Sequence, residues 1–248
     1  MADGRSPLAK LLLRVESRAL RASERVVVDT TANAMQVARL FGVPLERIVT
    51  APLALEEGET AASAALPRTD TLRVLFVGTF VPLQGTLVVA QAIHQLRDHE
   101  IEFVVIGNGQ QAEAAAPLLE SNPRVRWIRD WQSSAMLAGH MGAADICLGV
   151  FGGEGKAERV LPFKVYHALA HGKAVVTQSG YGTPGTPPIP CELVSPSAEA
   201  LAEAIVALKG DAERRRALGQ AARRYYLEHL DDAAVARAWR ALLADMQG

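Results

Sequence analysis

The stretch KAERVLPFKVYHALAHGKAVVT, residues 156–177, decides the fold, because it predicts a basic loop, a short helix and a buried strand in succession. Pro162 suits the first turn of the helix, where a missing N–H costs nothing, and Gly172 suits its C-terminal exit. The strand follows directly, at residues 173–177. The buried face of the helix consists of apolar residues four positions apart, Leu161, Val165 and Leu169.

Three cations of this stretch, Lys156, Arg159 and Lys164, are expected around the start of that helix. Just upstream, a strand at residues 146–150 runs into Gly152 and Gly153, so the helix should begin at the C-terminal edge of a sheet. Free backbone N–H groups, the positive end of the helix dipole and cationic side chains favour a phosphate at such a place. The alternative is a solvated basic loop without a ligand.

Composition narrows the class of protein without naming a function. The chain has 248 residues, of which 49% are hydrophobic, and its formal net charge of −1 does not indicate nucleic acid as a partner. Two cysteines, Cys147 in an apolar run and Cys191, favour a reducing compartment over a disulfide framework. There is no apolar run of about 20 residues and no signal-peptide pattern, so we expect a soluble, cytoplasmic protein.

From Leu72 onward, apolar strands alternate with helices. This alternation predicts an α/β fold, a Rossmann-like doubly wound parallel sheet with helices on both faces. The turn-rich residues 180–190 should form a loop, and residues 191–194 an edge strand. Strands are expected at 72–78, 101–107, 124–128, 146–150 and 173–177, and helices at 85–99, 110–120, 133–141, from Pro162, and at about 197–209, 211–229 and 231–246.

The first 70 residues do not fit the alternation. A strand at 25–29, a helix at 31–41 and the apolar segment 47–55 offer one strand without a sheet to join. We expect this part to be the remnant of another domain. The predicted organisation is a remnant at 1–55, a linker at 56–70, a Rossmann-like domain at 71–230 and a C-terminal helix at 231–248.

An amphipathic helix is expected at residues 8–22. Packing against another domain is the expected role, and peripheral contact with a membrane surface is the alternative. Its two faces are formed by apolar residues (Leu8, Leu11, Leu12, Val15 and Ala19) and by basic ones (Lys10, Arg14, Arg18 and Arg21).

Four segments together resemble the donor-binding half of two-domain GT-B glycosyltransferases, specifically the family-4 retaining group: VGTFVPLQGT (77–86), VVIGNG (104–109), ADICLGVFG (144–152) and residues 156–177. The segments VESRALRASERVVVDT (15–30) and LFGVPLERI (40–48) look like the crossover from the acceptor domain of that family. The resemblance implies binding of a sugar nucleotide, with no cofactor and no metal beyond that substrate.

The resemblance implies that the loop from Gly78 to Gly85 lies over the donor diphosphate, with Thr79 and Phe80 among the binding residues. Many members place a lysine where this chain has Gln84, and a cation binds phosphate more strongly than a neutral amide. Gln84 either contacts the donor or caps the turn.

Family members carry two glutamates separated by seven residues, near the sugar and the ribose. The corresponding positions here are Arg159 and His167. Arg159 and Lys164 are expected to face the diphosphate as catalytic residues, with Lys156 as a further contact. His167 either holds the ribose through one nitrogen or has no ligand. Glu154 or Glu158 is expected to supply a displaced carboxylate.

The base should lie between the ends of the second and third strands, with Trp131 either against the base or in ordinary packing. The loop 180–190 has no acidic residue with which to contact the sugar. The histidines His94, His99, His140 and His229 have no spacing typical of a metal site. Further candidates for base contact are Gly107, Asn108 and Gly109, and residues 130–132.

The expected function is hexosyl transfer from a UDP- or GDP-type sugar nucleotide to an acceptor. Because most of an acceptor half is missing from these residues, we expect a separate acceptor-domain subunit, a second copy of the chain or a longer parent chain to complete the cleft. The alternative is a non-catalytic nucleotide-sugar-binding or scaffold protein.

Overall fold

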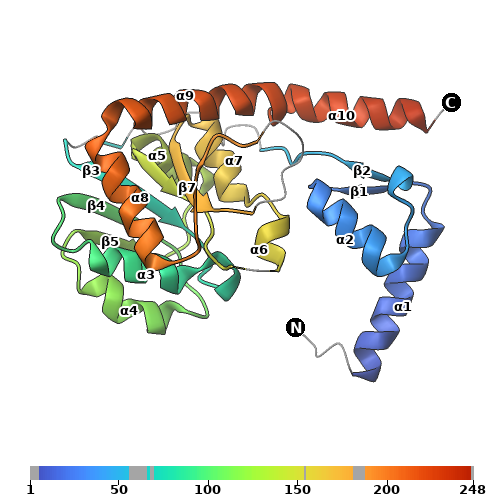
Figure 1. Ribbon diagram of the computed structural model, residues 1–248, viewed down its shortest axis with the longest axis horizontal. Helices are drawn as coiled ribbons and strands as arrows, with labels where there is room; N and C mark the ends of the chain where they lie inside the picture. The colour runs from blue at the N-terminus through green and yellow to red at the C-terminus, as the bar shows by residue number, and fades with distance from the viewer. Residues whose placement is uncertain (1–5, 56–65, 68–69, 154, 181–187, 247–248) are drawn as a thin grey trace.

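The computed structural model describes residues 6–55, 66–67, 70–153, 155–180 and 188–246. Figure 1 shows a large α/β part and a smaller N-terminal part beside it. Most of the expected linker, part of the expected loop 180–190 and Glu154 lie outside the described residues.

The large part is built on a six-stranded sheet with the order β5-β4-β3-β6-β7-β8. All neighbouring strands are parallel, so the predicted doubly wound sheet is confirmed, including its edge strand. β6 ends before the expected Val150, because the chain bends there and the Phe151 N–H donates to the Gln84 carbonyl at 3.1 Å. The strands are β3 (Leu72–Val77), β4 (Ile101–Ile106), β5 (Val125–Ile128), β6 (Ile146–Leu148), β7 (Ala174–Gln178) and β8 (Glu192–Val194).

Helices cover both faces of this sheet. One face packs against α3 (Thr86–Gln95), α4 (Ala112–Glu120) and α8 (Ala198–Gly210). The other face packs against α5 (Ser134–Ala143), α7 (Phe163–Ala170) and α9 (Ala212–His229).

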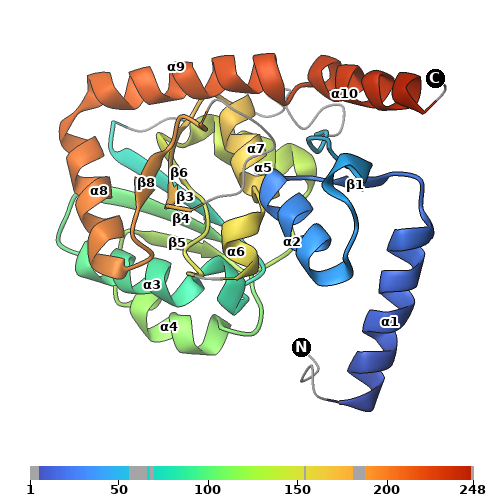
Figure 2. The same ribbon diagram turned by 45° about the vertical axis from the view of Figure 1, so that its right-hand side comes forward.

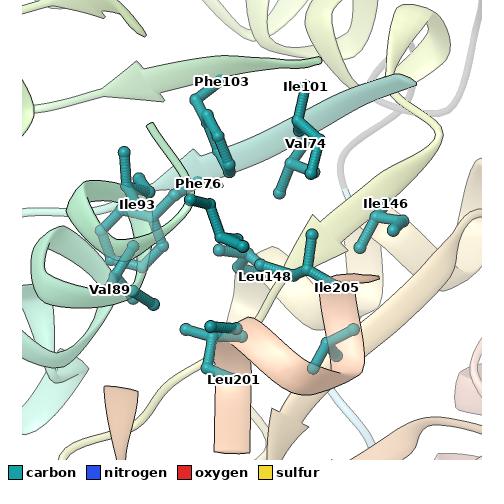
Figure 3. Close-up of a cluster of buried hydrophobic side chains, with 14 of the residues drawn as sticks. Val74, Phe76, Val89, Ile93, Ile101, Phe103, Ile146, Leu148, Leu201 and Ile205 are labelled. Carbon is teal, nitrogen blue, oxygen red and sulfur yellow. The ribbon is translucent and has the colours of Figure 1, made fainter. Parts of the chain in front are cut away.

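Successive strand residues point to opposite faces, which explains why the strands are apolar throughout. Val74 and Phe76 of β3 join the first core, shown in Figure 3, whereas Leu75 between them joins the second.

The N-terminal part contains α1 (Pro7–Ala22), β1 (Val26–Val28), α2 (Thr31–Phe41), the 3-10 turn η1 (Leu45–Arg47) and β2 (Ile48–Thr50). β1 and β2 pair in parallel, with Val26 beside Ile48. The expectation of one strand without a partner was therefore wrong. The second strand is only three residues long, too short for its periodicity to distinguish it from a loop.

The apolar face of α1 is uncovered in the described part of the chain. Leu8, Leu12 and Val15 are each more than half exposed, and no residue of α1 is buried. Figures 1 and 2 both show α1 projecting away from the large part. A stripe of this kind offers apolar area for a contact with something else.

Helix α10 (Asp232–Asp245) links the two parts. Figure 1 shows it following α9 and running over β1 and β2. Its Asp245 carboxylate accepts a 2.6 Å ion-paired hydrogen bond from Arg25. Within the described residues, none of the helices has both the length and the apolar character needed to cross a membrane.

Candidate functional site

The loop after β3 is closed by Gln84. The Gln84 side-chain oxygen accepts a hydrogen bond from the Thr79 N–H at 2.9 Å, and its amide nitrogen donates to the Thr79 hydroxyl at 3.3 Å. The 3-10 turn η2 (Pro82–Gln84) then leads to Gly85, directly before α3. These are the contacts of a turn-capping amide. Gly85 itself packs against the backbone of Phe151, which joins this loop to the one after β6.

The loop after β4 presses directly on the loop after β3. A Cβ atom on Gly107 would lie 1.7 Å from the Gly78 carbonyl oxygen, and one on Gly109 would lie 2.1 Å from that of Thr79. Both glycines also have positive φ angles, 133° and 147°. Only glycine allows this approach, so the two loops form one continuous wall. Asn108 stiffens the wall, because its side-chain oxygen accepts from the Gly109 N–H at 2.8 Å.

A cavity of about 500 Å³ opens beside this wall, at the C-terminal ends of β3, β4 and β5. Its size suits a small-molecule ligand, and ligands of open parallel sheets bind at this edge. The lining includes several of the predicted site residues, Gly78, Thr79, Gln84, Gly107, Asn108, Trp131 and Lys164.

A cavity of about 380 Å³ at the opposite end of β6 and β7 is a weaker candidate. Its lining contains four charged residues, Asp145, Lys173, Arg215 and Arg216. Three of them are already bonded: Asp145 accepts from the Arg73 N–H, Lys173 donates to the Gly142 carbonyl, and Arg215 donates to two backbone carbonyls. Most of the charge in this cavity is therefore satisfied without a ligand.

Lys164 supplies a cation to the wall of the larger cavity. Its ammonium nitrogen is buried and has no hydrogen-bond partner among the described residues. It lies 4.3 Å from the centroid of the Phe76 ring and beside Gly78, where an added Cβ would be 3.3 Å away. Burial lowers the pKa of Lys164 to about 7.

The position of Lys164 on α7 makes a second unfavourable contribution to the free energy of its charged form. The residue lies in the first turn of the helix, which follows Pro162, at the positive end of the helix dipole. A lone ammonium in such a place costs free energy, whereas an anion in the cavity would pair with it. In the first turn of α7, the Val165 N–H donates to the Pro162 carbonyl at 2.8 Å, whereas the N–H groups of Phe163 and Lys164 have no intrahelical acceptor and could meet an anion.

The other two predicted cations, Lys156 and Arg159, do not line this cavity. Residues 156–159 form a short helix, α6 (Lys156–Arg159), where a loop was expected. Lys156 is exposed. The Arg159 guanidinium donates to the Gly155 carbonyl at 2.8 Å, although its buried Nε has no partner in the described part of the chain. Of the three cations expected to converge, Lys164 is therefore the one that lines the cavity, where Arg129 is also present.

The predicted residues Glu158 and His167 also lie outside the cavity lining. The Glu158 carboxylate accepts from the Gly155 N–H at 3.4 Å and so caps α6. The His167 ring meets the Phe163 ring edge-on, with centroids 5.0 Å apart. His167 therefore contacts Phe163, a residue of the cavity lining, and is not itself part of that lining.

Phe80 is a core residue. It is fully buried, and its ring stacks on Trp127 with centroids 5.6 Å apart. It does not line the cavity, so its expected place among the donor-binding residues is corrected. Its backbone has a φ of 49°, which is uncommon for a residue other than glycine and which the loop sequence did not reveal.

Trp131 is 87% exposed and lines the cavity, so ordinary packing does not explain it. Its neighbour Arg129, also in the lining, lies 3.8 Å over the Trp127 ring and is paired with Glu120 at 2.6 Å. Three further lining residues were not predicted from the sequence: Arg129, Leu137 and Phe163. Phe163 had one usable signal, since it is a large apolar residue between Pro162 and Lys164 at the predicted start of a helix.

The family model for glycosyl transferases group 1 matches residues 71–211, more than half of the chain. The chain therefore belongs to this family of transferases. No curated protein sequence matches the chain.

Solved structures show the same fold at low identity. The chain is similar to a glycosyltransferase from Rickettsia africae (TM-score 0.75, 13% identity, 94% of this chain and 67% of that one). It is also similar to HepE (Alr3699) of Anabaena in complex with UDP-glucose (0.73, 15%, 98% and 70%). A third is the C-terminal domain of the group 1 glycosyl transferase LpcC from Francisella tularensis (0.55, 18%, 65% and 87%). The fold is thus that of the C-terminal half of a GT-B glycosyltransferase.

Proposed function

We propose that this chain binds a UDP- or GDP-type sugar nucleotide and takes part in hexosyl transfer, as a family-4-like retaining glycosyltransferase of the cytoplasm. The observation that carries the proposal is the Lys164 ammonium, buried without a hydrogen-bond partner among the described residues, in the wall of a ligand-sized cavity. Family membership and the UDP-glucose complex of HepE support this class of donor.

The diphosphate is proposed to lie against Lys164, Gly78 and the first N–H groups of α7. Those groups would stabilise the negative charge that builds up on the leaving diphosphate as the glycosidic bond breaks. The Arg159 guanidinium, whose Nε lacks a partner in the described residues, is proposed as a second cation. The base is proposed to lie toward Asn108 and Trp131. No resident cofactor or metal is part of the proposal.

A second protein surface is proposed to complete the cleft for the acceptor. Two exposed apolar surfaces support this: the uncovered stripe of α1, and Trp239 and Leu243 on α10. Each offers apolar area for a contact with another protein surface. The chain also spans about two thirds of the HepE chain, 70%. A separate acceptor-domain subunit, a second copy of the chain or further residues of a longer protein would each serve.

The alternative function is nucleotide-sugar binding without transfer. Two observations favour it: the Gln84 amide is already bonded to Thr79, and His167 does not line the cavity. Neither Gln84 nor His167 then binds the donor as the lysine and the glutamate found at these positions in the family would.

The test of donor binding is thermal unfolding with and without UDP, GDP and their glucose conjugates. Ligand at 100 times its dissociation constant should stabilise the folded protein by about 2.7 kcal/mol. The absence of any shift with all four compounds would contradict the proposal. Release of UDP or GDP from the sugar nucleotide then separates the two functions, since a transferase site should hydrolyse the donor slowly in water and a binding protein should not.

A further inference from the structure

Helix α6 lies between the N-terminal part and the glycine loop of the cavity. It contacts α2 on one side and η2 on the other. Figure 2 shows α6 between the large part and α2. Only residues 160–162 separate α6 from α7, so we expect a shift of α6 to reach the start of α7, where Lys164 is located.

Thr30 makes the hydrogen bond that ties α6 to the N-terminal part. Its hydroxyl donates to the carbonyl of Arg159, the last residue of α6. The same oxygen accepts from the Asn33 N–H at 3.1 Å, and the Thr30 side chain is fully buried. A buried hydroxyl that both donates and accepts has a defined position, so the α6 carbonyl is defined with it.

A second contact lies on the far side of Lys164. The backbone N–H of Leu53, which follows β2, donates to the hydroxyl of the buried Tyr166 at 3.5 Å. These two hydrogen bonds from the N-terminal part therefore reach residues 159 and 166, on either side of Lys164 in the chain.

We propose that Thr30 is a positioning residue for Lys164: through the carbonyl of Arg159, it holds the α6–α7 segment so that the ammonium stays in the wall of the cavity. This inference deepens the proposed function, since the ligand that meets the ammonium there is the diphosphate of a sugar nucleotide. The N-terminal part thereby contributes to nucleotide affinity without touching the nucleotide.

Release of the Thr30 bond has a defined consequence. The α6–α7 segment gains freedom, water reaches the ammonium, and its burial decreases. Lys164 then titrates closer to an ordinary lysine, because burial is the cause of its lowered pKa. Other charged groups that line the same cavity are Arg129 and Asp130, which come from the segment after β5 and lie outside the altered contact.

The test compares Thr30→Val, Thr30→Ser and a matched control, Ser197→Ala. Valine keeps the shape of threonine and removes the hydroxyl, whereas serine keeps the hydroxyl. Ser197 caps α8 by accepting from the Ala200 N–H at 3.2 Å, so its loss removes a helix cap without a change at α6. The control separates a general loss of stability from a loss of position.

The first readout needs no ligand. Unfolding free energy is measured by denaturant titration at pH 7, 7.5 and 8, below the range in which the thiols of Cys147 and Cys191 titrate in the unfolded chain. The part of the slope that is lost in Lys164→Met reports the lowered pKa of Lys164. We expect Thr30→Val to lose most of the slope that Lys164→Met also removes, and Thr30→Ser and Ser197→Ala to keep it. A wild-type slope in Thr30→Val would overturn the inference, and so would an equal loss in Ser197→Ala.

The second readout is the dissociation constant for UDP or GDP, whichever stabilises the wild type. We expect Thr30→Val to bind about tenfold more weakly, as for one misplaced charged contact, and Thr30→Ser to restore binding. Equal affinity of the valine variant overturns the inference. If the wild type binds neither nucleotide, the proposed function fails while the slope still decides the role of Thr30. If Thr30→Val does not fold, Tyr166→Phe applies the same readouts at the other end of the segment.

Discussion

The Lys164 ammonium lies 4.3 Å from the centroid of the Phe76 ring, in a place where burial removes its water. The face of the Phe76 ring attracts the ammonium electrostatically, and a desolvated cation–π pair of this kind contributes about 1–2 kcal/mol. Removal of the ammonium from water costs more, which is why burial lowers its pKa to about 7. A residue that the folded protein holds at a cost is a good candidate for function.

We therefore predict that Lys164→Met is more stable than the wild type without ligand. Methionine has a similar length and no charge to desolvate, so the gain at pH 7 should be about 1–3 kcal/mol. Denaturant unfolding measures this difference. Lys156→Met is the control, because Lys156 is exposed and its loss should change stability by about 0.5 kcal/mol at most. A methionine variant less stable than the wild type would show that the ammonium is well satisfied.

Stability should rise between pH 7 and pH 8. The pKa of Lys164 is lowered in the folded state, so the unfolded chain binds more protons in this window. Lys164 contributes up to about 1.4 kcal/mol per pH unit to the slope, and Lys164→Met should remove that contribution. An unchanged slope in that variant would assign the titration to another group. Above pH 8 the slope should decrease, because burial raises the pKa of Cys147 and Cys191 to about 12 and the unfolded chain then loses thiol protons that the folded protein keeps.

Below about pH 6.5 stability should fall. Burial, with the nearby charges of Arg126 and Arg73, lowers the pKa of His140, and burial lowers that of His171. The unfolded chain therefore takes up protons first as the pH drops toward 5. Denaturant unfolding at pH 5 and 6.5 measures the loss, and a His140→Gln variant should lose less. Equal losses in both proteins would exclude His140 as a contributor.

Gln84→Glu should raise the stability of the protein without ligand and weaken nucleotide binding. A carboxylate can still accept from the Thr79 N–H, and it lies beside Gly78, as does the Lys164 ammonium. We expect the new carboxylate and the Lys164 ammonium to form a pair that stabilises the fold. The added negative charge should repel a diphosphate and weaken its binding at least about tenfold. Calorimetric titration with UDP or GDP tests this. Undiminished affinity would place the diphosphate elsewhere in the cavity.

Trp131→Ala should weaken nucleotide affinity without a loss of stability. The ring is 87% exposed, so its removal leaves no core cavity. Stacking on a base contributes about 1–3 kcal/mol, which corresponds to a loss of roughly 5- to 150-fold. Trp131→Phe retains a stacking face and should recover much of the affinity. Thermal unfolding and titration of both variants give the answer, and unchanged binding in the alanine variant would remove Trp131 from the site.

The parallel sheet was predictable from the sequence because five apolar strands alternate with helices and a short sixth strand follows a loop. The order of the strands in the sheet was not predicted. Lys164 and the glycine loops were predictable because a loop after a strand and a helix start share one sheet edge. The place of Phe80 was not, because its burial against Trp127 depends on a contact distant in sequence. Nor was α6, whose few residues carry no periodic signal, or the pairing of β1 with β2, which depends on contacts distant in sequence.

The most direct test of a sugar-nucleotide site at Lys164 is calorimetric titration of UDP and GDP into the wild type and Lys164→Met at pH 7. We expect that the wild type binds one of the two nucleotides and that Lys164→Met, although the more stable protein, binds it at least about tenfold more weakly. Equal affinity in the two proteins, or no binding by the wild type, would contradict it.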